Sequence, residues 1–121
     1  MIELNINDRA FNAIRNGTKK IEIRVNKINS KKDYGKINEN DIIEFRNSIG
    51  DKINCRVIKN KWYKSIEELL VIEGTQYTLS STNDFEKGIA SINSIDGYKE
   101  GIMKNGVFAI HLEYLNENLN S

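Results

Sequence analysis

The chain contains no proline, one cysteine and one histidine among its 121 residues. The cysteine, Cys55, cannot form an intramolecular disulfide, and it has no cysteine or histidine partners at the spacing of a structural zinc site. The histidine, His111, has no clustered carboxylate or cysteine, and it is expected to face solvent or to form a local hydrogen bond. We therefore expect no metal, no cofactor and the reducing environment of the cytoplasm.

Long apolar runs are also missing. No window approaches the roughly 20 apolar residues that a membrane-spanning helix requires. The first residues lack the basic and apolar regions of a signal peptide. We expect neither membrane insertion nor secretion, so the predicted protein is soluble, cytoplasmic and without a membrane partner.

The composition is that of a folded chain. Hydrophobic residues form 39% of it and charged residues 29%, a balance far from the low hydrophobicity and high net charge of disordered segments. Neither an internal repeat nor a linker is present. We predict a single domain over residues 1–115, followed by a polar C-terminal tail over 116–121.

Charge is distributed unevenly along the chain, although the net charge is only +1. Residues 1–63 carry 14 basic and 8 acidic side chains, whereas residues 64–121 carry 4 and 9. A basic face contributed by the first half would favour contact with phosphate groups. The alternative is that the lysines between residues 27 and 36 lie on a solvated loop.

The spacing of apolar residues predicts the element order β-α-β-β-β-α-α-β. The predicted strands cover residues 2–6, 21–25, 41–46, 52–63 and 106–114. The predicted helices begin at the caps Asn7 or Asp8, at the capping box Ser65-Ile66-Glu67-Glu68 and near Thr82. Residues 94–105 are expected to form a helical turn or a loop, and residues 26–40 a long loop.

The second predicted strand carries the main candidate site. Lys19, Glu22 and Arg24 offer a point cation, a carboxylate acceptor and a bidentate donor, a set that can hold a phosphate and a base edge. Strict alternation places Lys19 on the opposite face from Glu22 and Arg24, so Lys19 joins them only if it lies in the loop before the strand. The alternative is an ion pair of Glu22 with Arg24 or Lys20 on a solvated face.

Four segments together make the chain resemble the ASCH domain, a family of the PUA-like superfamily. They are Gly17-x-Lys19-x-x-Glu22-x-Arg24, Asn40-Asp41-Ile42-Ile43-Glu44-Phe45, the stretch from Tyr63 to Leu70, and Gly106-Val107-Phe108-Ala109-Ile110. The resemblance spans nearly the whole chain. It implies an α+β fold, a small mixed PUA-like β-barrel of five to six strands with flanking helices, and a basic cleft generally associated with RNA binding. Two turns depart from the family pattern: Asn40 replaces a glycine and Ser80-Ser81 replaces Pro-Gly.

Some small bacterial ASCH proteins that resemble this chain hydrolyse N4-acetylcytidine with a lysine, a threonine and a distant glutamate. The resemblance aligns these roles with Lys19, Glu22 and a position near Glu73. Glu22 cannot supply the hydroxyl nucleophile, so Lys19, Glu22 and Glu73 are catalytic candidates only for a different hydrolytic arrangement.

Aromatic and basic residues alternate at the end of the long fourth strand. Trp62 and Tyr63 lie between Lys61 and Lys64, a pattern in which bases can stack on rings while lysines neutralise phosphates. The alternative is that these rings pack in the core or at its rim. We expect one of the two to pack and the other to be exposed.

These patterns favour a protein that binds RNA, a nucleotide or a nucleoside in a basic cleft. The candidate binding residues are Lys19, Lys20, Glu22, Arg24, Lys61, Trp62 and Tyr63. Two alternatives are an amidohydrolase acting on an N4-acylated cytidine-type nucleoside and a module for protein interaction.

Overall fold

The computed structural model describes residues 1–116. Its elements are β1 (Ile2–Asn5), α1 (Asp8–Asn16), β2 (Ile21–Arg24), the short 3-10 helix η1 (Tyr34–Lys36), β3 (Ile42–Arg46), β4 (Lys52–Tyr63), α2 (Ile66–Glu73), α3 (Phe85–Asn93), α4 (Tyr98–Asn105) and β5 (Val107–Leu115). The predicted order is confirmed, with α4 as a further helix where a helical turn or loop was expected. The predicted tail beyond residue 116 lies outside the described residues.

The five strands form one mixed sheet in the order β1-β3-β4-β5-β2. β1 pairs with β3 in parallel, and the other neighbours are antiparallel. The sheet is curled, so its two edge strands lie close to each other. A single side chain joins them: Arg24 Nη2 of β2 donates to the carbonyl of Asn5 in β1 at 2.8 Å. The predicted α+β class, with a small barrel-like mixed sheet and flanking helices, is confirmed.

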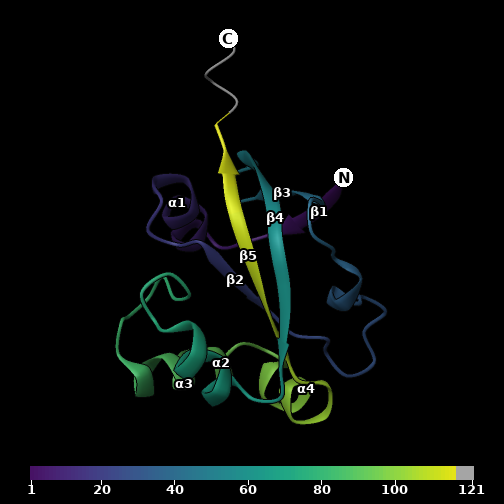
Figure 1. Cartoon of the computed structure of the whole chain (residues 1–121), viewed down its shortest axis with the longest axis vertical. Coiled ribbons are helices and arrows are strands. Elements are labelled where there is room, and N and C mark those ends of the chain that lie inside the picture. The colour runs from purple at the N-terminus through teal and green to yellow at the C-terminus, as the bar shows by residue number, and fades with distance from the viewer. Residues whose placement is uncertain (117–121) are drawn as a thin grey trace.

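Apolar side chains fill both sides of the sheet. On one side, residues of β2, β4 and β5 pack against α2, α3 and α4, which gather where β4 ends and β5 begins (Figure 1). On the other side, Phe11 and Ile14 of α1 pack with Phe45 of β3 inside the curl. Because β2 alternates between these two sides, its charged residues point into the molecule and do not form the solvated face considered above.

Local caps set the ends of the helices, and two of the three predicted helix starts are confirmed. The Asn7 side chain accepts from Ala10 N at 2.8 Å, and Gly17 ends α1 at φ 86°. The Ser65 side chain accepts from Glu68 N at 3.1 Å. The following helix begins at Phe85 and not near Thr82, because the Asp84 side chain caps it.

The loop over residues 26–40 is held against the sheet. Asn60 of β4 donates to the carbonyls of Tyr34 and Ile37, at 2.8 and 3.0 Å. Asn40 takes φ 72°, so it adopts the left-handed conformation that glycine adopts at no steric cost. No helix within residues 1–116 is long and apolar enough to cross a bilayer.

Candidate functional site

A buried cluster of three charges lies at the start of β2. The Glu22 carboxylate is 2.8 Å from Arg24 Nη2 and 3.4 Å from Lys19 Nζ. Lys19 precedes the first strand residue, Ile21, so it meets the condition that lets it share a side of the sheet with Glu22. Lys19 and Glu22 are only 5% and 7% exposed, which makes this an interior ion cluster.

The Lys19 ammonium group has one acceptor for each of its three N–H donors. Besides facing Glu22, its Nζ donates to the carbonyls of Ile21 and Thr78 at 2.6 and 2.7 Å. An ammonium carries three N–H donors, and three acceptors surround this one. Burial lowers the pKa of Lys19 below its ordinary value, and the nearby Glu22 carboxylate opposes that shift only in part. The ammonium form of Lys19 is the one that can donate to all three acceptors.

Glu22 and Arg24 stabilise each other's charge. Burial disfavours the ionised carboxylate, but Arg24 and Lys19 outweigh it and lower the pKa of Glu22 below its ordinary value. Burial likewise disfavours the guanidinium, while Glu22 raises the pKa of Arg24. Arg24 Nη1 also lies 3.5 Å from the Tyr34 hydroxyl. Glu22 and Arg24 therefore stay ionised at neutral pH.

The three charges line a cavity of about 250 Å³ between β2, the start of α1 and α3. Its charged lining residues among those described are three cations, Arg9, Lys19 and Arg24, and one carboxylate, Glu22. The other lining residues are Asn5, Ile6, Asn7, Ala10, Ile23, Thr78, Leu79, Ser80, Ser81, Ser91, Ile92, Ile95 and Tyr98. This excess of positive charge in a partly enclosed space attracts an anion.

Several of these lining residues carry no sequence signal that would have singled them out. Arg9 lies in an amphipathic helix like many exposed arginines, and Asn5 ends a short strand. Ser80 and Ser81 stand out only because they replace the Pro-Gly of the ASCH pattern that the sequence resembles. Arg9 Nε donates to Ser80 Oγ at 3.3 Å across 71 residues of sequence, a pairing that no local pattern indicates.

Glu73 does not line this cavity. Its carboxylate instead accepts from the Tyr63 hydroxyl at 2.6 Å and lies 3.0 Å from His111 Nε2. Burial raises the pKa of Glu73, but hydrogen bonds from Tyr63 and His111 lower it more, so its net pKa is below the ordinary value. The three hydrolase candidates Lys19, Glu22 and Glu73 therefore do not converge on one cavity.

Tyr63→Phe is expected to lower the free energy of unfolding by about 1–2 kcal/mol, because it removes a hydrogen bond to a partly buried carboxylate. Urea unfolding measures this loss. Tyr98→Phe is the matched control, since the Tyr98 hydroxyl lies 3.5 Å from its carbonyl partner and should contribute less. Equal losses in the two variants would contradict a special role for the Tyr63 bond.

Trp62 and Tyr63 point to opposite sides of β4, as expected of adjacent strand residues. Tyr63 is 3% exposed, with Lys61 Nζ 5.2 Å from its ring centroid, whereas Trp62 is 54% exposed. Trp62 pairs with Phe108, which pairs with Arg24, so these three residues lie in one row on one side of the sheet. The exposed indole thus lies on the same side of the sheet as the charge cluster.

Lys20, the remaining binding candidate, lies outside this cavity, and its Nζ is 4.9 Å from the centroid of the Tyr77 ring. No group of histidine, cysteine, aspartate and glutamate residues suited to a metal ion occurs within residues 1–116. Cys55 is buried, and burial together with the charge of Glu22 raises the pKa of its thiol to about 12. The reactive thiolate is therefore not populated at neutral pH.

Comparison with known protein families and with curated proteins returns no match. Among solved structures, the chain is similar to the crystal structure of the hypothetical protein PH0355, with 29% identity and a TM-score of 0.79 over 93% of this chain and 97% of the other. It is also similar to the solution structure of protein PF0455 from Pyrococcus furiosus, with 24% identity and a TM-score of 0.70 over 95% and 97% of the two chains. These similarities support the fold described above.

Proposed function

We propose that this chain is an ASCH-type protein that binds a nucleotide, free or within RNA, in the cavity lined by Lys19, Glu22 and Arg24. The observation that carries the proposal is the lining of that cavity, which has three cations and a single carboxylate. Its volume of about 250 Å³ is below the 300–1,000 Å³ typical of pockets for drug-sized ligands, so it suits one nucleoside unit and excludes a duplex.

The lining offers suitable partners for both parts of a nucleotide. Arg24 has donor capacity left on Nη1, and Arg9 lies at the rim, so the two can neutralise a phosphate. The ionised Glu22 carboxylate can accept from an exocyclic amino group of a base. Because Lys19 holds Glu22 in place and ionised, this acceptor is preorganised.

Arg24→Gln is expected to weaken the binding of a ribonucleoside 5′-monophosphate at least tenfold, because it removes a charge-assisted hydrogen bond from the cavity. Titration calorimetry with AMP, CMP, GMP and UMP measures the affinity. The affinity of the unmodified protein should also fall as salt concentration rises, since phosphate neutralisation contributes to it.

Arg46→Gln is the matched control, because Arg46 follows Glu44 in β3 at the spacing at which Arg24 follows Glu22, and it does not line the cavity. The circular dichroism and unfolding midpoint of each variant establish that it is folded at the temperature of the titration. A folded Arg24→Gln protein that binds all four nucleotides like the unmodified protein would rule out this site.

The amidohydrolase alternative requires a free base or nucleophile. In this cavity Lys19 Nζ is held by three acceptors, and the Glu22 carboxylate is a weak base because its pKa is lowered and it is paired with both Lys19 and Arg24. We therefore expect N4-acetylcytidine to be bound without conversion to cytidine. Chromatography of the mixture after prolonged incubation checks this, and release of cytidine that disappears in Lys19→Met would restore the hydrolase hypothesis.

A further inference from the structure

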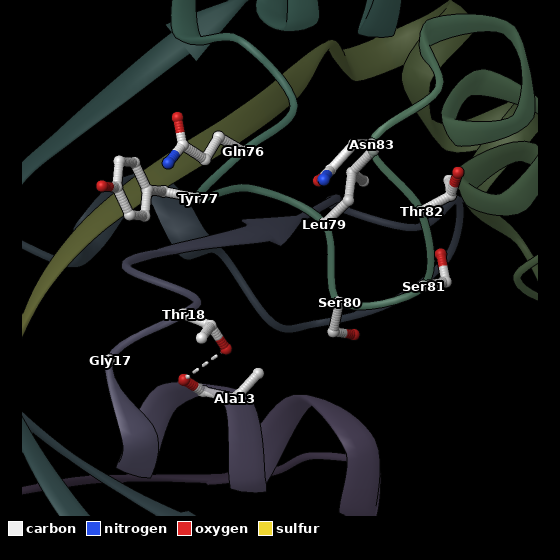
Figure 2. Close-up of a pocket in the computed structure, with 10 residues that line it drawn as sticks. All are labelled: Ala13, Gly17, Thr18, Gln76, Tyr77, Leu79, Ser80, Ser81, Thr82 and Asn83. Atoms are coloured by element: carbon white, nitrogen blue, oxygen red, sulfur yellow. Dashed lines mark hydrogen bonds between the residues drawn. The ribbon is translucent and has the colours of Figure 1, made fainter.

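A second and larger cavity lies beside the first. It has a volume of about 610 Å³ and lies between the C-terminal end of α1 and the segment 76–83. Its lining residues are Ala13, Gly17, Thr18, Gln76, Tyr77, Leu79, Ser80, Ser81, Thr82 and Asn83. Figure 2 shows Tyr77 and Gln76 at one end of the segment and Ser80 and Ser81 toward the other.

The two cavities are neighbours through shared residues. Leu79, Ser80 and Ser81 line both of them. Arg9 lines the smaller cavity and donates to Ser80 Oγ at 3.3 Å, so a cation lies at this junction. A phosphate held near Arg9 and Ser80 would therefore lie at the boundary between the cavities.

The segment around Tyr77 and Thr78, which separates the two cavities, is held by hydrogen bonds to residues 19–21 at the start of β2. The carbonyl of Tyr77 accepts from the amides of Lys20 and Ile21, at 2.9 and 3.0 Å. The next carbonyl, that of Thr78, accepts from Lys19 Nζ at 2.7 Å. The charge cluster of the first cavity and the wall of the second are thus held by the same short stretch of chain.

The lining of the larger cavity differs in chemistry from that of the smaller one. Seven of its ten described lining residues carry a hydroxyl or amide group and none carries a charge, which suits the ribose and base of a nucleoside better than a phosphate. Tyr77 adds an aromatic ring that is 39% exposed, with Lys20 Nζ 4.9 Å from its centroid. Exposed aromatic rings beside cations are typical platforms for single-stranded nucleic acids.

We infer that the ligand is a strand of at least two nucleotides: one nucleoside occupies the smaller cavity, the linking phosphodiester lies at Arg9 and Ser80, and the neighbouring nucleoside stacks on Tyr77 in the larger cavity. This inference rests on the proposed function, and it favours a nucleotide within RNA over a free nucleotide as the ligand. A free mononucleotide would leave the larger cavity without a role, whereas single-stranded RNA occupies both.

The test compares probes of equal charge. The 5′-(methyl phosphate) and the 3′-(methyl phosphate) of a nucleoside N each carry one diester charge and one nucleoside. In the dinucleoside monophosphates ApN and NpA, adenosine replaces the methyl group of the 5′ ester and of the 3′ ester, respectively. The base N is the one whose mononucleotide binds best. Titration calorimetry is expected to show that one dinucleoside of the two binds about five- to a hundredfold more tightly than its methyl ester, because base–aromatic stacking contributes a free energy of that size.

Tyr77 variants locate the gain. Tyr77→Phe should keep the tighter binding of the dinucleoside. Tyr77→Ala should bring the affinity of the dinucleoside close to that of its methyl ester, while the carbonyl of residue 77 still accepts from the amides of Lys20 and Ile21. Arg9→Gln should weaken both diester probes several-fold, whereas Lys99→Gln, an exposed lysine of α4, should leave both affinities unchanged.

The outcomes separate the inference from the proposal on which it rests. Mononucleotide binding with no gain from either dinucleoside overturns the two-nucleoside inference and leaves the proposed function standing. A gain that survives Tyr77→Ala overturns the assignment of the second nucleoside to the larger cavity. Failure of every mononucleotide and dinucleoside to bind overturns the proposed function, and the inference with it.

Discussion

Glu22→Gln is expected to lower the free energy of unfolding by about 3–5 kcal/mol, because it leaves two buried cations without their shared carboxylate. Lys19 keeps two carbonyl partners and Arg24 keeps the carbonyl of Asn5, but neither keeps a counter-charge in this cluster. Urea unfolding followed by circular dichroism measures the loss, and a shift of the midpoint without a change in slope identifies it as a loss of stability.

Glu44→Gln is the matched control within the same sheet. Glu44 pairs with Arg46 at 2.8 Å and with the same two-residue spacing, but its partner is exposed, with a side chain 36% accessible against 12% for Arg24. Solvent screens such a pair, so Glu44→Gln should lower the free energy of unfolding much less than Glu22→Gln does. Similar losses in the two variants would mean that burial does not govern the contribution of Glu22.

The same carboxylate makes stability depend on pH. The folded-state pKa of Glu22 is lowered, so its contribution is complete above the ordinary glutamate pKa of 4.5 and is lost as pH falls through the lower folded value. Unfolding measured between about pH 6 and 3 should therefore show a decline that is smaller in Glu22→Gln. Part of the decline should persist in this variant, because the pKa of Glu73 is lowered as well.

Gly106→Ala is expected to lower the free energy of unfolding by about 2–4 kcal/mol. Gly106 has φ 76° and ψ −162°, a region that is essentially restricted to glycine. A Cβ there would clash with Trp62 Nε1, so the indole would have to move and would lose its 2.9 Å hydrogen bond to the carbonyl of Asn105. Trp62 is the one tryptophan of the chain, so its fluorescence emission reports this displacement directly.

Gly74→Ala separates backbone strain from the clash. Gly74 has nearly the same conformation, φ 78° and ψ 177°, but an added Cβ would meet nothing within 4 Å. Its expected cost is therefore strain alone, about 1–3 kcal/mol, with the fluorescence of Trp62 unchanged. A spectral shift in Gly74→Ala, or its absence in Gly106→Ala, would contradict the contact between Gly106 and the indole.

The charge cluster ties three parts of the chain together at the site where we propose that the ligand binds. Lys19 ties the segment just before β2 to Thr78, Arg24 ties β2 to β1, and Glu22 holds both cations in position. Since breaking such a cluster is costly, its geometry persists when no ligand is bound. A ligand that binds there encounters a preformed site and does not need to order it.

Local patterns predicted the elements well because the interactions that set them are local. The side chains of Asn7 and Ser65 satisfy amides three residues onward, and Gly17 supplies the left-handed conformation that ends α1. The start of α3 was placed too early, because Thr82 and Asp84 are both good caps and only the Asp84 side chain accepts from a first-turn amide, that of Lys87.

The environment of the candidate site followed from the sequence only in part. The spacing of Lys19, Glu22 and Arg24 predicted that they would meet if Lys19 preceded the strand, and they do. That the cluster is buried depends on the curl of the sheet, which covers a charged strand face that alternation alone assigns to solvent. The separation of Glu73 from Lys19 likewise depends on how α2 packs against the sheet.

The sequence by itself determined the order of the elements and the three charges of the candidate site, because strand alternation, helix caps and short spacings act between near neighbours. The class of fold was expected from the resemblance of four segments to the ASCH domain. Only the tertiary structure decided which distant residues complete that site. Thr78 reaches Lys19 across 59 residues and Ser80 reaches Arg9 across 71. Contacts of this range depend on how the whole chain folds around its two apolar cores, which no local pattern encodes.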